Sequence, residues 1–380
     1  MDRKIHCLNK ISKVGLSVLP KNYAVVDSLQ EGVDAILVRS AAMHEMTLPK
    51  SVKCVARAGA GVNNIPLDRF ADEGVVVFNT PGANANAVKE LTIAMMLLAA
   101  RDLRGSMEWV KANKTDPEIS KSMEKAKAAY AGTEIMGKTL GVIGLGAIGA
   151  LVADAASKLG MHVIAVEPSE ATVERNAKYL SEVELVDYDE LYKKSDYITV
   201  HVPLLDATKG MLNEQAFNKM KDGVIIINAA RDALVNDSDL EMALRSGRVR
   251  KYVTDFPNAR TANMEGVVAI SHLGASTEEA EDNCADMAAT QVVNYLENGN
   301  IVNAVNYPSL KLGVRTSSRV VVLFKAGEDV EARLLKELKT YGLGNFVSGV
   351  KGTHGALVAD VSREPDLSHV KEVIKVHFVK

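Results

Sequence analysis

The chain has 380 residues, of which 47% are hydrophobic, and a formal net charge of −3 at pH 7. This length fits two or three domains, and the apolar fraction is that of an ordinary globular protein. Because lysine and arginine are scattered rather than clustered, neither nucleic acid nor an anionic membrane is an expected partner.

The cysteines and the apolar runs of the sequence indicate the cellular compartment of the protein. Cys7, Cys54 and Cys284 are odd in number and widely spaced, which favours reduced thiols over disulfides. No zinc-ligand spacing occurs, so no metal is expected. The N-terminus lacks the apolar core of a signal peptide, and the longest apolar stretch, Ile93–Ala100, is too short to span a membrane. A cytoplasmic protein is therefore expected.

The first hundred residues alternate short apolar runs with helical patterns. Strands are predicted over Ala35–Val38, Val52–Arg57 and Val75–Phe78. A short helix is predicted over Asp68–Glu73, and a strongly apolar one begins at Asn86. This part is interpreted as a parallel sheet of its own. The apolar helix and the polar stretch after it, Lys111–Lys127, are interpreted as the crossing to a second domain.

The most specific motif in the chain is a glycine fingerprint. Gly144, Gly146 and Gly149 form GxGxxG directly after the apolar run Leu140–Ile143. In this motif the first glycine makes a tight strand-to-helix turn, and the second lets backbone N–H groups approach a pyrophosphate. The third allows close packing of helix on strand, and the helix N-terminus faces the phosphates.

The residues after the fingerprint have the periodicity that a dinucleotide site requires. A helix is predicted over Ala150–Leu159 and a buried strand over Met161–Val166, which ends at Glu167. A carboxylate at that point accepts the ribose hydroxyls of NAD and repels the 2′-phosphate of NADP. The alternative is a glycine-rich turn without a ligand, but strand, helix and terminal acid together predict NAD as the cofactor.

The alternation of strands and helices continues through the next hundred residues and predicts a doubly wound sheet. The strands are expected over Tyr197–Val202, Val224–Asn228, Lys251–Asp255 and Val267–Ser271. The helices are expected over Leu212–Met220, Ser238–Ser246 and Thr277–Leu296.

The last part of the chain, residues 314–380, has a pattern of its own. It reads as strand Arg319–Phe324, helix Asp329–Tyr341, strands near Phe346–Val350 and Leu357–Val361, helix Leu367–Ile374 and a final strand. This βαββαβ order is ferredoxin-like, an arrangement that says nothing by itself about ligands.

Three polar residues follow predicted strands at the edge where open α/β sheets bind ligands: His201, Arg231 and His272. Oxidation of an alcohol by NAD needs a base for the hydroxyl proton and a cation for a substrate carboxylate. Arg231 can grip a carboxylate through two parallel hydrogen bonds, and the His272 imidazole suits proton transfer near neutral pH. The alternatives are a solvated loop arginine and a structural histidine.

Seven motifs spread over residues 30–308 resemble the D-2-hydroxyacid dehydrogenases, and most of all their D-3-phosphoglycerate dehydrogenase branch. They are Val-Arg-Ser at 38–40, Arg-Ala-Gly-Ala-Gly-Val-Asn-Asn at 57–64, Asn-Thr-Pro-Gly-Ala-Asn-Ala-Asn at 79–86, Gly-Thr-Glu-Ile-Met-Gly-Lys-Thr-Leu-Gly at 132–141, His-Val-Pro-Leu at 201–204, Asn-Ala-Ala-Arg at 228–231 and His-Leu-Gly-Ala-Ser-Thr at 272–277.

The resemblance implies a role for each matching residue. Arg231 would hold the substrate carboxylate, His272 would be the general acid and base, and His201 would be a structural neighbour. The implied NAD contacts are Gly144, Gly146, Ala147, Ile148, Gly149, Glu167, Val202, Ala229, Ala230, Arg231, Asp255, His272 and Gly274, with Asp255 on the nicotinamide amide. The implied substrate contacts are Arg39, Arg57, Ala58, Gly59 and Arg231, with Arg39 and Arg57 on a phosphate; neither has an obvious acidic partner in the sequence.

The chain departs from the family where a glutamate normally pairs with the catalytic histidine. Arg260 occupies that position, five residues after Asp255. A guanidinium beside His272 would favour the neutral imidazole and move the acid limb of activity to lower pH. The alternatives are that Arg260 points to solvent or reaches a substrate phosphate, and that Glu265 folds back to replace the glutamate. In a further departure, Asp232 stands where the family usually has glycine, and it either is solvated or weakens anion binding.

With this resemblance, the expected fold is α/β with two doubly wound parallel-sheet domains and a small C-terminal βαββαβ domain. A flavodoxin-like substrate domain would comprise residues 1–100 and 290–310, and a Rossmann NAD domain residues 101–289. Residues 314–380 resemble an ACT domain, but the loop after its first strand reads Lys-Ala-Gly-Glu-Asp without the usual Pro-Gly. Serine feedback is therefore left open, whereas an oligomerising role suits the module.

The implied reaction is NAD-dependent oxidation of 3-phosphoglycerate to 3-phosphohydroxypyruvate, the first step of serine synthesis. One alternative is a broader reductase of glyoxylate or hydroxypyruvate that uses Arg231 and His272 without Arg39 and Arg57. The other is a non-catalytic NAD-binding sensor. The expected partners are a phosphorylated 2-hydroxy acid and a second copy of the chain, with higher assembly through the C-terminal domain left open.

Overall fold

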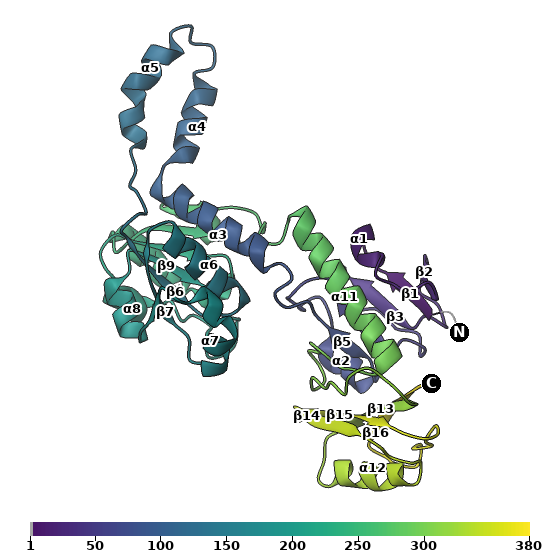
Figure 1. The fold of residues 1–380 in the computed structure, drawn as a ribbon. Coiled ribbons are helices and arrows are strands. Elements are labelled where there is room, and N and C mark those ends of the chain that lie inside the picture. Colours follow the sequence, from purple (N-terminus) through teal and green to yellow (C-terminus); the bar gives the residue numbers. More distant parts are fainter. Residues whose placement is uncertain (1–2) are drawn as a thin grey trace. The chain divides into compact units, whose positions relative to one another are not determined.

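The computed structural model describes residues 3–380, which divide into two compact units (Figure 1). The first unit comprises the chain up to Asn84 together with Glu278–Lys380, and the second comprises Ala85–Thr277. Each unit is built around its own parallel sheet, as the sequence predicts.

The first unit contains a five-stranded parallel sheet with the strand order β2-β1-β3-β4-β5, which is the flavodoxin-like order. Its strands are β1 (Arg3–Cys7), β2 (Tyr23–Val26), β3 (Ala35–Val38), β4 (Cys54–Arg57) and β5 (Val76–Phe78). The first two were not predicted, because β1 is rich in polar residues and β2 is a half-exposed edge strand. The other three confirm the prediction.

Three helices accompany this sheet: α1 (Lys13–Leu16), α2 (Leu67–Asp72) and α11 (Glu278–Asn298). The long helix α11 lies against α1, β3 and β4. It buries a row of small and aromatic residues that includes Cys284, Ala288 and Tyr295. Although α11 follows the second sheet in sequence, this packing makes it part of the first unit.

The C-terminal segment forms an antiparallel sheet with the order β14-β15-β13-β16. Its elements are β13 (Arg319–Lys325), α12 (Val330–Lys339), β14 (Phe346–Lys351), β15 (His354–Asp360) and β16 (Val373–Val379). Alternate residues of β13 enter different cores, because side chains along a strand point to opposite faces. Val320 and Val322 pack with α12, whereas Val321 and Leu323 join the core around α11.

The predicted helix over Leu367–Ile374 is wrong. In its place, two successive turns join Val370 N to Leu367 O and Val373 N to Val370 O, and β16 begins at Val373. The buried side chains of Leu367 and Val370 have helical spacing, but one turn suffices to bury both. The module is therefore βαβββ, with the strand order of a ferredoxin-like fold but one helix instead of two.

The units also differ from the expected domain boundaries. The C-terminal sheet shares a continuous core with α11 and the first parallel sheet, so it belongs to the first unit rather than standing alone. The helix α3 (Ala85–Ala100), expected in the substrate domain, packs on the second unit's α6, β10 and β11. Its buried methionines, Met95 and Met96, join that unit's core.

The second unit has a seven-stranded parallel sheet in the order β12-β11-β10-β9-β6-β7-β8, the 3-2-1-4-5-6 Rossmann order with one added strand. The strands are β6 (Thr139–Ile143), β7 (His162–Val166), β8 (Val183–Leu185), β9 (Tyr197–Val200), β10 (Val224–Asn228), β11 (Val249–Thr254) and β12 (Val267–Ala269). The helices around it are α6 (Ala147–Lys158), α7 (Glu170–Asn176), α8 (Tyr188–Lys194), α9 (Glu214–Lys219) and α10 (Asp237–Arg245), with 3₁₀ turns Lys127–Tyr130, Ala177–Tyr179, Asp232–Leu234 and Thr261–Asn263. The doubly wound parallel sheet predicted for this part of the chain is confirmed.

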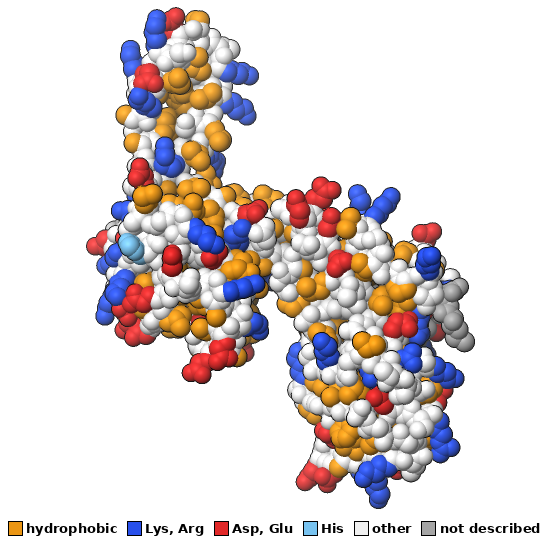
Figure 2. All heavy atoms as spheres, viewed as in Figure 1, with side chains coloured by type: hydrophobic (Ala, Val, Ile, Leu, Met, Phe, Trp, Pro, Cys, Tyr) orange, Lys and Arg blue, Asp and Glu red, His pale blue; other side chains and the backbone are white. Residues whose placement is uncertain are grey.

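Two unpredicted helices form an arm on the second unit: α4 (Leu103–Ala112) and α5 (Ile119–Ala126). They run side by side away from the sheet, and neither contains a buried residue (Figure 1). Apolar side chains lie on the surface of the arm (Figure 2), among them Met107, Val110 and Met123. Across residues 3–380, no helix is long and apolar enough to cross a membrane.

A buried histidine makes the stability of the first unit pH-dependent. His377 on β16 is 6% exposed, and burial together with the charges of Lys53 and Arg3 lowers its pKa from 6.5 to about 3. Between these values the unfolded chain binds a proton that the folded chain does not, so stability falls as pH falls below 6.5.

We expect His377→Phe to remove this contribution. The wild type should lose about 1.6 kcal/mol more than the variant between pH 6.5 and pH 5, because the slope rises from half its full value at pH 6.5 to about 1.4 kcal/mol per pH unit. Denaturant unfolding at several pH values measures the difference in slope, which is insensitive to any repacking cost of the phenyl ring. Parallel stability curves for the two proteins would contradict the assignment.

Candidate active site

The glycine fingerprint forms the turn between β6 and α6. Gly144 has a φ of +91°, and a Cβ there would lie 2.8 Å from Val202 Cγ1. A Cβ on Gly149 would overlap the carbonyl oxygen of Gly144. A Cβ on Gly146, in contrast, would meet no atom within 4 Å. The first and third glycines are therefore required by packing, and the second leaves open space over the backbone, as a cradle for phosphates requires.

Two side chains form hydrogen bonds that hold the fingerprint turn in place. Glu167, at the end of β7, accepts hydrogen bonds from Leu145 N at 2.9 Å and from Ser169 N at 3.0 Å. The buried Asn176 on α7 donates to Leu145 O at 2.9 Å. The predicted ribose acid thus lies against the fingerprint turn. Asn176 was missed, because nothing in its helical surroundings in the sequence links it to the turn.

Asp255, directly after β11, presents a buried acceptor. Its Oδ2 accepts from Gly274 N at 3.0 Å, whereas its Oδ1 is buried and accepts no hydrogen bond from any described residue. Burial raises the pKa of Asp255, against the opposing effect of the Gly274 N–H. An unsatisfied buried carboxylate oxygen is costly unless a ligand donor completes it. The carboxamide N–H of a nicotinamide is such a donor, so these residues fit NAD.

The loop carrying Arg231 is shaped by the buried Asn228. Its Oδ1 accepts from Ala230 N at 3.0 Å and from Arg231 N at 3.3 Å. Its Nδ2 donates to Arg231 O at 2.8 Å and to the Tyr252 hydroxyl at 2.9 Å. Burial raises the pKa of Tyr252 to about 12, so its phenol stays neutral. This network orients Ala229, Ala230 and Arg231 at the carboxyl end of β10.

The structure brings Arg231 and His272 to the same aromatic ring. The Arg231 guanidinium carbon lies 5.1 Å from the centre of the Phe256 ring, and its Nη1 donates to Ala230 O at 2.6 Å. The His272 ring lies 4.2 Å from Phe256, centre to centre, with the planes tilted by 42°. His272 is exposed, and Phe256 is half-buried. Phe256 was missed, because an aromatic residue after a strand reads as part of the core.

Arg260 does not serve as a partner for His272. Its Nη2 donates to Glu241 Oε2 at 2.8 Å and its Nη1 to Ser238 Oγ at 2.8 Å, so the guanidinium is engaged by α10. The predicted effect of Arg260 on His272 therefore has no structural basis. Glu265 precedes β12 and His272 follows it. Since the intervening strand places them at opposite edges of the sheet, Glu265 does not replace the missing glutamate.

His201 lies half-buried beside the fingerprint turn, with a ring nitrogen engaged by a threonine hydroxyl. Its Nε2 lies 2.9 Å from Thr199 Oγ1, and burial lowers its pKa from 6.5 to about 4. The neutral ring packs where α6 begins. This is the structural position that the resemblance implies for it.

The predicted phosphate residues lie in the first unit. Arg57 Nε donates to Arg39 O at 2.9 Å, and its guanidinium also donates to Gly61 O. Arg39 Nη2 lies 2.7 Å from Glu281 Oε1, at the start of α11. The acidic partner that sequence spacing did not reveal for Arg39 is thus supplied by a helix more than 200 residues away.

Two further predicted residues adjoin these arginines. Ala58 is buried, and Gly59 has a φ of +157°. A Cβ on Gly59 would lie 3.1 Å from Arg57 Nη1, so glycine leaves room for that guanidinium.

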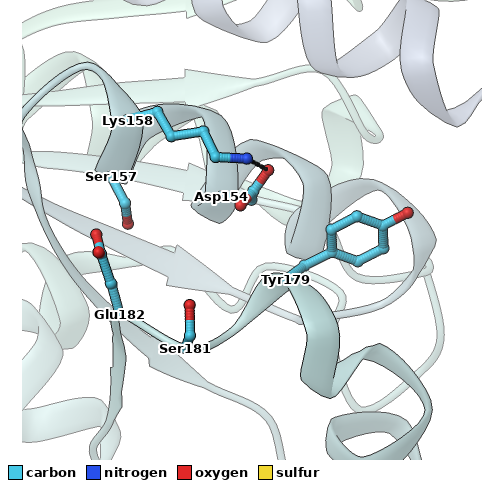
Figure 3. A pocket seen from close by; sticks show the side chains of 6 residues that line it. All are labelled: Asp154, Ser157, Lys158, Tyr179, Ser181 and Glu182. Carbon is cyan, nitrogen blue, oxygen red and sulfur yellow. Dashed lines mark hydrogen bonds and ion pairs between the residues drawn. The ribbon is translucent and has the colours of Figure 1, made fainter.

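A small polar pocket of about 280 Å³ lies elsewhere on the second unit (Figure 3). It is lined by Asp154, Ser157, Lys158, Tyr179, Ser181 and Glu182. Three of these form the last turn of α6, a helix about 18 Å long that starts at the fingerprint. The pocket is therefore remote from the fingerprint turn and contains none of the predicted site residues.

The second unit combines a Rossmann sheet, a fingerprint turn and a cation and imidazole at the strand ends, and comparison with known proteins identifies the class. Residues 93–274 match the family model of the D-isomer specific 2-hydroxyacid dehydrogenase NAD-binding domain. A hydroxypyruvate reductase of Thermotoga maritima is 37% identical over 66% of this chain and 80% of its own length. The chain belongs to the D-isomer specific 2-hydroxyacid dehydrogenase family.

The chain is also similar to phosphoglycerate dehydrogenases. That of Archaeoglobus fulgidus is 36% identical over 77% of this chain and 53% of its own length. The NAD⁺-bound 3-phosphoglycerate dehydrogenase of Entamoeba histolytica matches in structure with a TM-score of 0.63 and 26% identity, over 80% of this chain and 99% of that one. The chain spans about half the length of curated phosphoglycerate dehydrogenases that it matches.

Proposed function

We propose that this protein interconverts 3-phosphoglycerate and 3-phosphohydroxypyruvate with NAD, the reaction that opens serine synthesis. The observation that carries the proposal is the convergence of Arg231 and His272 on Phe256, beside the unsatisfied Oδ1 of Asp255. The similarity to phosphoglycerate dehydrogenases supports this substrate among those of the family.

Each of these residues has a distinct chemical task. NAD, when bound, supplies the hydride chemistry. Arg231 binds the substrate carboxylate and polarises the neighbouring carbonyl. A planar guanidinium suits this task, because its N–H groups match the two oxygens of a carboxylate. His272 accepts the hydroxyl proton during oxidation and returns it during reduction. Asp255 would hold the nicotinamide carboxamide as a hydrogen-bond acceptor, and Glu167 would hold the adenosine ribose.

The first test is NADH oxidation by the purified protein with 3-phosphohydroxypyruvate, beside glyoxylate and hydroxypyruvate at equal concentration, with NADPH as the cofactor control. We expect kcat/KM to favour the phosphorylated substrate by several orders of magnitude and NADPH to be a poor substitute. Equal rates with all three acids would support the alternative, a broad reductase. The similarity to a hydroxypyruvate reductase favours that alternative. So does the Arg39–Glu281 pair, because Glu281 already engages the arginine proposed to bind the phosphate. NADH binding without turnover would leave a sensor.

The Arg39–Glu281 pair provides a test of the phosphate assignment. Both side chains are partly exposed, so the pair is weak, and a substrate phosphate competes with the Glu281 carboxylate for Arg39. We expect Glu281→Gln to lower KM for 3-phosphohydroxypyruvate by about threefold to fivefold at low salt, as expected for an exposed ion pair. KM for glyoxylate, which has no phosphate, is the internal control. An equal change for both substrates would place Arg39 away from the phosphate.

We also propose that the protein is a cytoplasmic homodimer that pairs through the arm formed by α4 and α5. An unburied pair of amphipathic helices with exposed Met107, Val110 and Met123 is characteristic of an interface. The free thiols of Cys7, Cys54 and Cys284 suit a reducing compartment. The C-terminal module is ACT-like in its strand order, and it packs as part of the first unit. Sedimentation of the wild type and of Met107→Asp tests the interface; a dimeric variant would contradict it.

A further inference from the structure

The active-site histidine of this chain lacks the carboxylate partner that normally orients such a ring. Among the described residues, neither nitrogen of His272 has a hydrogen-bond partner; the ring contacts the Phe256 ring, and the Asp255 carboxylate interacts with it only through its charge. Arg260 and Glu265, the two sequence candidates, are both directed elsewhere. Some other group must restrict the ring, because a general base works only when it is held in the reactive orientation.

Phe256 stands on a rigid base. Its backbone N–H donates to Thr254 Oγ1 at 3.0 Å, and the two residues before it, Thr254 and Asp255, are fully buried at the end of β11. Pro257 follows and restricts the backbone on the other side. The end of the sheet therefore fixes the position of Phe256. The exposed His272 contacts its phenyl ring.

The ring also contacts the second functional group. A guanidinium carbon 5.1 Å from a ring centre is within the range of a cation–π interaction, and an imidazole at 4.2 Å is within stacking distance. Arg231 and His272 thus contact the same phenyl ring, so a shift of that ring displaces both. A tilted ring contact of this kind also leaves both imidazole nitrogens free to reach a substrate, unlike a hydrogen bond from a carboxylate.

We propose that Phe256 is a positioning residue that orients His272 and Arg231 together, in place of the missing carboxylate. This inference rests on the proposed function, in which those two side chains contact the substrate. Phe256 itself takes no proton and touches no reacting atom. Its task is to hold the imidazole plane and the guanidinium at a constant separation.

The test compares Phe256→Leu, which removes the aromatic ring, with Phe256→Tyr, which keeps it. Phe217→Leu is the matched control, since Phe217 is a buried phenylalanine on α9 in the same unit and lies in a different core. We expect Phe256→Leu to lower kcat for 3-phosphohydroxypyruvate reduction by about 10-fold to 100-fold, as misplacement of reacting groups does. NADH affinity should be unchanged. Phe256→Tyr should retain most of the activity, and Phe217→Leu should affect stability alone.

A spectroscopic measurement separates positioning from a general structural role. The ring protons of His272, identified in histidine-labelled protein as the signals lost in His272→Gln, should be shifted upfield by the Phe256 ring current. The shift should disappear in Phe256→Leu and persist in Phe256→Tyr. Unshifted His272 signals in the wild type, or full activity of Phe256→Leu, would overturn the inference. Wild type without any turnover would overturn the proposed function instead, and the NMR signals, which need no turnover, would then decide the positioning alone.

Discussion

Replacing His272 with glutamine is expected to lower kcat for reduction of 3-phosphohydroxypyruvate by about 10²–10⁴-fold, the usual contribution of a positioned acid or base. Glutamine keeps a polar side chain of similar length but cannot exchange a proton near neutral pH. NADH should still bind, because the fingerprint turn and Asp255 do not depend on the imidazole for their own hydrogen bonds. Steady-state kinetics together with NADH fluorescence titration measure both quantities.

His162→Gln is the control for this experiment. His162 is an exposed histidine at the amino end of β7, at the sheet edge opposite the strand ends that carry the site. The same chemical change there should leave kcat within a factor of two of the wild type, since surface substitutions have small effects. A His272→Gln variant as active as His162→Gln would show that proton transfer passes through another group.

Replacing Arg319 with alanine is expected to destabilise the first unit by about 3–5 kcal/mol, as breaking a buried ion pair does. The guanidinium is 2% exposed and donates to Asp360 Oδ1, to Asn298 O and to Gly313 O, each at 2.8 Å. It therefore joins the end of α11, the segment after it and two strands of the C-terminal sheet. Its loss removes the guanidinium donor from the half-buried Asp360 carboxylate and from Asn298 O, whereas Gly313 O keeps a hydrogen bond from Asn300 Nδ2 at 3.0 Å.

Denaturant unfolding followed by hydrogen exchange of β13 and β15 measures the effect of Arg319→Ala. The matched control is Arg333→Ala, on α12 of the same sheet, where the arginine pairs with Glu372 at 2.8 Å but is 51% exposed. An exposed pair of this kind contributes about 0–1 kcal/mol. Adding Asp360→Asn to Arg319→Ala should recover part of the loss, because it removes the uncompensated charge. Equal losses in Arg319→Ala and Arg333→Ala would show that burial does not set the energy of the Arg319 pair.

The sequence by itself determined the two parallel sheets and the cofactor turn. Buried parallel strands are continuous apolar runs, so β3, β9 and β10 were recognisable without their neighbours. Two of the fingerprint glycines are required by local geometry, Gly144 by its positive φ and Gly149 by the carbonyl oxygen of Gly144, and both constraints involve residues close in the chain. Arg231, His272 and Asp255 could be placed at one sheet edge, because parallel strands share the edge where they end.

Local pattern was insufficient where distant segments meet. Leu367 and Val370 have helical spacing, but they lie in a turn that leads directly into a strand. The helices α4 and α5 have no buried face of their own. The boundaries of the two units depend on which sheet α3 and α11 cover, and a helix's sequence does not specify its partner.

The functional contacts that only the tertiary structure decided are those between side chains far apart in the chain. Glu281 reaches Arg39, α10 engages Arg260, and Phe256 lies against both Arg231 and His272. Hydrogen bonds and ring contacts act over a few ångströms, whereas the order of residues records proximity only along one backbone. The sequence therefore determined which chemical groups the site contains, and the packing of strands and helices determined which of those groups touch.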